Sequence, residues 1–266
     1  MILKHAAPFA RGYETIVSRS GAHADILMDF GVLTLASGES WRVGAADETA
    51  TLLMSGSAQF SWSGGKATVA RRSLLDESPT VLHLGDGEDA TILAGANGAV
   101  FAVTRTDNPT RFEPRLLLPS ECRGEERGKG TMRETSTRIV RTVFDDTDSP
   151  DSMLVLGEVV GAPGKWSSYP PHHHPQPEIY HYRFLPKAGF GLTRIGEEAH
   201  VLQDGDTALI REGEVHPQVS APGYAMWYLW VIRHLEGARY ATPVFAEEHL
   251  WVTRKDAAIW KPPSER

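Results

Sequence analysis

Histidine and glutamate side chains in the second half of the chain have the types and the spacing of metal ligands. Three histidines stand in a row between prolines, and strand side chains alternate between two faces, so His172 and His174 share a face while His173 points away. Glu178 can return a carboxylate to that face, and His216 can add a third imidazole. Imidazole nitrogen and carboxylate oxygen suit zinc, manganese and iron. These residues therefore predict a site for one divalent ion, zinc first, with manganese or iron as alternatives.

Such ligands need a rigid frame, and most segments with a clear pattern read as short strands rich in β-branched, aromatic or aliphatic residues. The first series comprises Ile26–Leu35, Thr51–Met54, Ala58–Trp62, Val81–Leu84, Ala90–Leu93 and Val100–Val103. The second comprises Ile139–Phe144, Met153–Val160, Trp166–Tyr169, Glu178–Leu185, Phe190–Ile195, Thr207–Ile210 and Tyr224–Arg233. Gly64-Gly65 supplies a tight turn, and convincing amphipathic helices are scarce. The pattern predicts an all-β chain with a duplicated sandwich or barrel.

The two series predict two domains joined by a connector. Residues 1–107 form the first domain, without a metal motif, and residues 134–266 form the second, with the metal motif and a C-terminal tail. The proline-rich and charged stretch 108–133 has little hydrophobic periodicity and is expected to connect them. Seven of the eleven histidines fall in the second series, so we expect the chemistry there.

Charge and composition limit the classes of molecule that the protein is expected to bind. The net charge is −7 and no basic run is present, which argues against nucleic acid or an acidic membrane surface and favours a small molecule. A single cysteine, Cys122, and an N-terminus without the order of a secretory signal indicate a reducing, cytoplasmic setting. No apolar run approaches the roughly 20 residues that a membrane-spanning helix needs.

The ligand spacing is similar to both motifs of the cupin superfamily. His-x-His-(three residues)-Glu is followed by Gly-(seven)-Gly-(two)-His, ending at His216. Alone, three histidines between prolines could equally be a solvated loop, but two motifs in register favour the metal site. The segments Gly164–His172, Glu178–Phe184 and Glu212–Tyr224 resemble more closely the 5-deoxy-glucuronate isomerase family of myo-inositol catabolism, and more distantly the 5-keto-4-deoxyuronate isomerases. The likeness covers most of the chain and is weaker in the first half.

The resemblance implies a bicupin, with two double-stranded β-helix (jelly-roll) barrels in one chain, and a metal held by His172, His174, Glu178 and His216. It also implies an intramolecular oxidoreductase that converts 5-deoxy-glucuronate, an aldose acid, into the ketose 2-deoxy-5-keto-gluconate. Such a reaction moves a proton between adjacent carbons while the metal acts as a Lewis acid. A homodimer or a higher assembly is implied as well.

Strand alternation suggests which other residues share the site. Glu178, Tyr180 and Tyr182 fall on one face and are the predicted catalytic residues, whereas His181 falls on the opposite face, packed or at an interface. The predicted substrate-binding residues are two cations for the sugar-acid carboxylate and one aromatic ring for the sugar, namely Lys165, Arg183 and Tyr228.

Two alternatives to the isomerase stay open. Iron in the same ligand set supports dioxygenases, which consume oxygen whereas isomerisation does not. A cupin without catalytic activity could instead bind a sugar acid as a sensor or carrier. The connector from His174 to Glu178 is shorter than is common in the family, which would reshape the pocket beside the metal.

Overall fold

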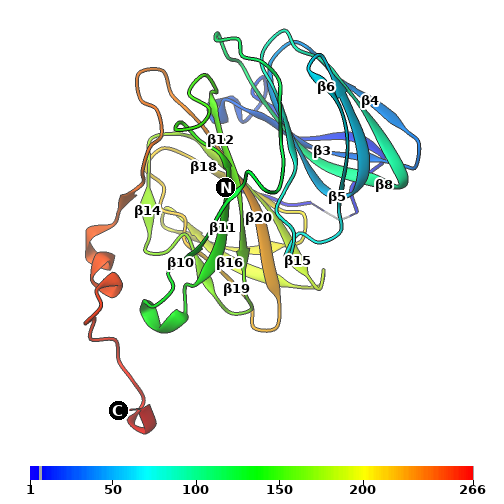
Figure 1. The fold of residues 1–266 in the computed structure, drawn as a ribbon. Coiled ribbons are helices and arrows are strands. Elements are labelled where there is room, and N and C mark those ends of the chain that lie inside the picture. Colours follow the sequence, from blue (N-terminus) through cyan, green and yellow to red (C-terminus); the bar gives the residue numbers. More distant parts are fainter. Residues whose placement is uncertain (6–7, 266) are drawn as a thin grey trace.

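Strands are the main secondary structure in the computed structural model of the chain, which describes residues 1–5 and 8–265 (Figure 1). The first barrel is one eight-stranded sheet in the order β2-β3-β8-β5-β7-β9, with β4 paired to β8 and β6 to β5. Its strands are β2 (Gly12–Val17), β3 (Asp29–Leu35), β4 (Ser40–Val43), β5 (Glu48–Trp62), β6 (Gly65–Arg71), β7 (Val81–Leu84), β8 (Ala90–Thr106) and β9 (Arg115–Leu117), and the 3-10 helix η1 (Ala24–Ile26) precedes β3.

The second barrel has a seven-stranded sheet, β1-β18-β15-β20-β12-β11-β10, and a four-stranded sheet, β13-β19-β16-β17. Its strands are β1 (Ile2–Leu3), β10 (Arg123–Arg127), β11 (Arg138–Phe144), β12 (Leu154–Gly161), β13 (Trp166–Ser167), β15 (Glu178–Leu185), β16 (Phe190–Ile195), β17 (Glu198–Gln203), β18 (Thr207–Ile210), β19 (Gln218–Ser220) and β20 (Ala225–Arg233). β14 (His172–His173) pairs with β21 (Val244–Phe245), and the 3-10 helices are η2 (Met132–Glu134), η3 (Glu247–Thr253) and η4 (Pro263–Glu265). The predicted all-β class is confirmed.

Two pairs of predicted strands are single long strands. Thr51–Met54 and Ala58–Trp62 both belong to β5, and the two segments predicted around residues 90–103 both belong to β8. The register between β5 and β8 shifts near Gly56, which has φ +91° and lies so close to β8 that an added Cβ would be 2.2 Å from the Gly98 carbonyl oxygen. The break between the two predicted strands is therefore a β-bulge, which bends a strand without ending it.

The stretch 108–133, predicted as the connector, contributes to both barrels. β9 pairs with β7 in the first barrel, and β10 pairs with β11 in the second. At the N-terminus, β1 pairs with β18, so a strand that precedes the first barrel in sequence belongs to the sheet of the second barrel. The division into 1–107, 108–133 and 134–266 stays a prediction.

The barrels share one buried core. Alternate residues of β15 face different sides: Ile179 packs in a cluster with first-barrel residues such as Phe30, whereas Tyr180 and Tyr182 pack inside the second barrel. His181, predicted to be packed or at an interface, lies between the barrels, buried, with its ring 5.3 Å from that of Phe30. Burial lowers the pKa of His181 to about 3, so the imidazole is neutral. The other face of β15, which carries Glu178, Tyr180 and Tyr182, points into the second barrel.

A buried ion triad also joins the two barrels. Glu158 of β12 accepts hydrogen bonds at 2.7 Å from Arg71 of β6 and at 2.7 Å from Arg141 of β11. The two guanidinium groups also donate to the backbone carbonyls of Leu74 and Glu77. All three side chains are buried, so each charge depends on the others for compensation.

Cys122 should react slowly with thiol reagents in the folded protein. Burial, followed by the nearby Glu158 carboxylate, raises the pKa of its thiol to about 11. Because the thiolate is the reactive form, alkylation by iodoacetamide at pH 8 should be about 100-fold slower than in the urea-unfolded chain. Equal rates, followed by mass spectrometry in the two states, would contradict the buried setting of this side chain.

Among the described residues, no helix is both long enough and apolar enough to cross a bilayer.

Candidate metal centre

Three of the four predicted ligands converge in the second barrel. One ligand atom each from His174, Glu178 and His216 lies within 4.8 Å of the other two, and all three residues are buried. The Nε2 atom of His174 is 3.2 Å from Oε2 of Glu178, and that of His216 is 3.4 Å from the same oxygen. Glu178 opens β15 on the inward face, so the strand directs its carboxylate between the two imidazoles.

The fourth predicted ligand, His172, lies at the edge of this group. Its ring centroid is 4.7 Å from that of His216, and β14 pairs it with Phe245 of β21. His174 also contacts His216, at 5.5 Å between ring centroids. His172 and His174 thus both lie close to His216.

The three imidazoles are oriented by backbone carbonyls. Each Nδ1 atom must donate, because its partner is a carbonyl oxygen, which can only accept. The pairs are His172 with Pro170 at 3.1 Å, His174 with Gln176 at 2.9 Å, and His216 with Glu214 at 2.8 Å. In a neutral imidazole this leaves the Nε2 lone pair free. The same pattern fixes the tautomer of histidines that bind metals.

The electrostatics of the group fit a cation. Burial lowers the pKa of His172 to about 4 and that of His216 well below its usual value, so both present lone pairs at neutral pH. Burial also raises the pKa of Glu178, which reflects the cost of a carboxylate charge at this depth. No hydrogen-bond partner for the buried Nε2 of His216 is found in the described part of the chain. A divalent ion would satisfy these atoms, and the donor set suits zinc, manganese or iron.

Tyrosines and small polar residues line the barrel beside the ligands. Tyr180, Tyr182 and Tyr228 are buried there. Their hydroxyls contact Ser168 at 3.2 Å for Tyr180, Gln218 for Tyr182, and Ser167 at 2.6 Å for Tyr228. Burial raises the pKa values of Tyr180 and Tyr182 well above 10, so both phenols keep their protons. The Tyr180 ring lies 5.6 Å from that of His216, which makes it the predicted catalytic tyrosine nearest to that ligand.

The two predicted cations do not join this group. Arg183 faces the opposite side of β15 from Tyr182, and its Nε donates to Asp204 at 2.9 Å. Lys165 donates to the backbone carbonyl of Glu134. Of the substrate-binding residues predicted, the structure brings only Tyr228 to the barrel interior.

Some residues at the centre were not predicted. Gln218 follows His216 by two positions, so strand alternation could have indicated it. Tyr240 and Phe245 come from the segment after β20, and their rings lie 5.1 Å from His174 and 5.5 Å from His172. Burial raises the pKa of Tyr240, with the Glu178 carboxylate as the next cause. No pattern in that segment points to the site.

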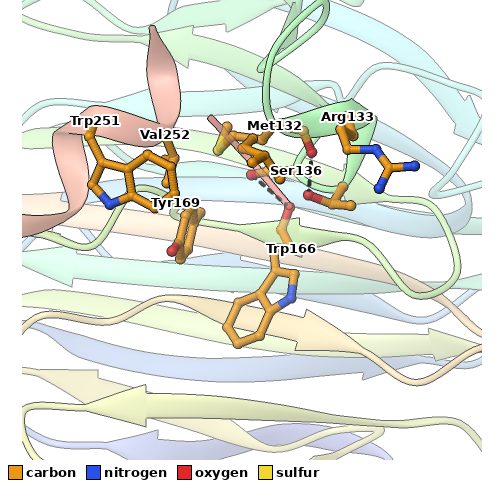
Figure 2. A pocket seen from close by; sticks show the side chains of 9 residues that line it. Met132, Arg133, Ser136, Trp166, Tyr169, Trp251 and Val252 are labelled. Carbon is orange, nitrogen blue, oxygen red and sulfur yellow. Dashed lines mark hydrogen bonds between the residues drawn. The ribbon is translucent and has the colours of Figure 1, made fainter. Parts of the chain in front are cut away.

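A cavity of about 590 Å³ lies where η2, the β13 region and η3 meet (Figure 2). It is lined by Met132, Arg133, Thr135, Ser136, Trp166, Tyr169, Trp251, Val252 and Ile259. Figure 2 shows Trp251 and Val252 of η3 beside Tyr169, with Met132 and Ser136 next to them. None of the four predicted metal ligands lines this cavity, although Tyr169 precedes His172 by three residues.

Comparison with solved structures identifies the architecture. An IolB-like protein from Salmonella typhimurium superposes with a TM-score of 0.83 at 23% identity, covering 94% of this chain and 98% of that one. The oxalate decarboxylase of Lactobacillus farciminis superposes with a TM-score of 0.65 at 12% identity, covering 91% and 86%. That of Bacillus subtilis, a protein described with Mn(II) centres, gives 0.62 at 13%, covering 92% and 78%. The predicted bicupin fold is confirmed.

Sequence comparison is more specific. A 5-deoxy-glucuronate isomerase of Geobacillus kaustophilus is 30% identical over 224 residues, which cover 76% of this chain and 78% of that protein. One of Geobacillus thermodenitrificans is 34% identical over 136 residues, 46% and 47% of the two chains. The KduI/IolB family matches residues 1–252. With this match over nearly its whole length, the chain belongs to the KduI/IolB family.

Proposed function

We propose that this protein is a metal-dependent isomerase that converts 5-deoxy-glucuronate into 2-deoxy-5-keto-gluconate. The observation that carries the proposal is the convergence of imidazole Nε2 atoms on Glu178, in a chain whose relatives are named 5-deoxy-glucuronate isomerase. His172, His174, Glu178 and His216 would hold one divalent ion, zinc first, with manganese or iron as alternatives. When bound, such an ion supplies a Lewis acid for a substrate oxygen.

The residues around the ligands would manage the protons. In an aldose–ketose isomerisation, one proton leaves the carbon beside the aldehyde and one is delivered to the aldehyde carbon. The aldehyde oxygen gains a proton and the neighbouring hydroxyl loses one, so the reaction is balanced without another reactant. Tyr180 keeps its phenol proton and lies beside His216, so we assign it the role of donating a proton to the aldehyde oxygen and recovering one from the hydroxyl. Tyr182, held by Gln218, supports it from the next inward position. Glu178 keeps its second predicted role, as a proton acceptor.

The barrel would bind the substrate largely enclosed. Tyr228 presents a buried ring and a hydroxyl fixed by Ser167, which suits the apolar face and the hydroxyls of a sugar. Lys165 and Arg183 have partners elsewhere, and we do not retain them as carboxylate ligands. A homodimer or higher assembly and a cytoplasmic setting remain part of the proposal.

Conversion of 5-deoxy-glucuronate can be followed directly by NMR. The protein loaded with zinc or manganese should convert the aldehyde signal into that of the ketose without consuming oxygen. Treatment with a chelator should remove activity, and the same metal should restore it. An absence of conversion by the metal-replete protein would refute the substrate assignment, and oxygen uptake would redirect the reaction class to an oxygenase.

A further inference from the structure

Arg138 is a buried cation inside the second barrel. It opens β11, two residues before Val140, which packs in the same interior cluster as Tyr180, Tyr182 and Tyr228. In the sheet it is opposite Gly161 of β12, which carries no side chain. Its relative exposure is 7%, so the guanidinium is removed from water almost completely. Burial lowers the pKa of Arg138, which marks the cost of holding that charge there.

The guanidinium is only partly satisfied by protein groups. Nη1 donates to the carbonyl oxygen of Ser136 at 2.8 Å and to its Oγ at 3.1 Å. Nε is buried and has no hydrogen-bond partner in the described part of the chain. An arginine has five N–H donors, and buried charges are normally paired. Donors at Arg138 thus remain for a further acceptor.

The other buried arginines provide the contrast. Arg71 and Arg141 share Glu158, and Arg233 lies 3.3 Å from Asp107. Among residues 1–5 and 8–264, no carboxylate forms an ion pair with Arg138. A cation that is nine-tenths buried, without an anion, is explained if the anion belongs to a ligand.

Hydrogen bonds around Arg138 connect it to the tyrosines of the candidate metal centre. Ser136, which holds Nη1, donates to the Trp166 carbonyl at 3.3 Å, and the next residue, Ser167, contacts Tyr228 at 2.6 Å. The guanidinium therefore lies on the same side of the barrel as the tyrosines that face the ligands.

We propose that Arg138 binds the carboxylate of a sugar acid whose other end faces Glu178 and the histidines. The planar guanidinium can form two parallel charge-assisted hydrogen bonds with a carboxylate, which would set the orientation of the substrate as well as its affinity. The inference rests on the proposed function for the placement of the aldehyde, and it extends that function by assigning the residue that would bind the substrate carboxylate. It replaces Lys165 and Arg183 in the role that the sequence suggested for them.

The test compares a carboxylate with its uncharged amide. Binding of glucuronate and of glucuronamide to the zinc-loaded protein is measured by titration calorimetry. The wild-type protein should prefer glucuronate by about 10- to 100-fold, the range expected for charge-assisted hydrogen bonds. Arg138→Gln should remove the preference, and Arg138→Lys should give an intermediate value, because lysine keeps the charge but not the paired donors.

Arg127→Gln is the matched control. Arg127 is the register partner of Arg138 on β10, is exposed and pairs with Glu125, so its replacement makes the same change of charge outside the barrel and should keep the wild-type preference. Thermal unfolding separates binding from structure: a midpoint of Arg138→Gln at or above that of the wild type supports a ligand role, since an uncompensated buried charge is lost.

Several outcomes would overturn the inference. A wild-type protein that binds both probes equally, or neither, has no carboxylate site of this kind. An unchanged preference in Arg138→Gln, or in Arg138→Lys should the first variant fail to fold, places the site elsewhere. A preference that depends on Arg138 in a protein that does not convert 5-deoxy-glucuronate would refute the proposed reaction and leave the carboxylate site standing.

Discussion

Replacing His174 and His216 together with alanine is expected to remove the bound metal and to lower the isomerase rate by about 1,000-fold or more. These imidazoles flank Glu178 at 3.2 and 3.4 Å, so the double variant leaves at most one histidine and one carboxylate for an ion. A metal that stabilises developing charge contributes several kcal/mol, and each 1.36 kcal/mol is a factor of ten in rate. Elemental analysis of untagged protein measures the metal, and NMR measures the rate.

His173→Ala is the control for that experiment. His173 lies between two predicted ligands in sequence, and alternation turns it away from them, opposite Val244 of β21. Its replacement should leave metal content and rate close to those of the wild-type protein. Equal metal content in the double variant and the wild type would refute the assignment of the centre, whatever the activity.

Replacing Glu158 with glutamine is expected to destabilise the protein by about 3–5 kcal/mol, because it leaves two buried guanidinium groups without an anion. Arg71 and Arg141 both donate to this carboxylate at 2.7 Å, and they belong to different barrels. The unfolding midpoint should fall by about 10 °C for a chain of this size. Urea and thermal unfolding, followed by circular dichroism, measure the change.

Glu125→Gln is the comparison for this prediction, since its ion pair with Arg127 is exposed on β10 and should contribute at most about 1 kcal/mol. Replacing the whole triad, Arg71, Arg141 and Glu158, with leucine or methionine should recover much of the loss, because no uncompensated charge then remains. A single Glu158→Gln variant as stable as Glu125→Gln would contradict the account of the triad as a buried link.

The parts of the site that follow strand alternation could be predicted from the sequence. The two-residue period of β15 places Glu178, Tyr180 and Tyr182 on one face and His181 on the other, and the interior and interdomain clusters have this division. The strands β15, β16 and β18 have the predicted bounds. The prediction of two separate strands around Gly56 was wrong, because the small residues there form a bulge within the single strand β5.

Tertiary features determine the remaining residues of the site. Arg138 faces the interior only because β11 pairs with β12 in one register out of several, which the sequence of β11 does not specify. Tyr240 and Phe245 lie in a segment with no clear periodicity and reach the histidines through the pairing of β21 with β14. Charge and nearness in sequence favour Lys165 and Arg183, but their partners Glu134 and Asp204 hold them away from the ligands.

The pairing of β14 with β21 also has a consequence for the order in which the protein matures during translation. The strand that carries His172 obtains its partner from Val244–Phe245, close to the end of the sequence, whereas the first barrel needs nothing later than β9 for its own sheet. Domains generally fold as they leave the ribosome, with the N-terminal one first. The first barrel of the nascent chain would therefore fold before β21 has been synthesised and can pair with β14. Metal loading should consequently be a late step of biosynthesis.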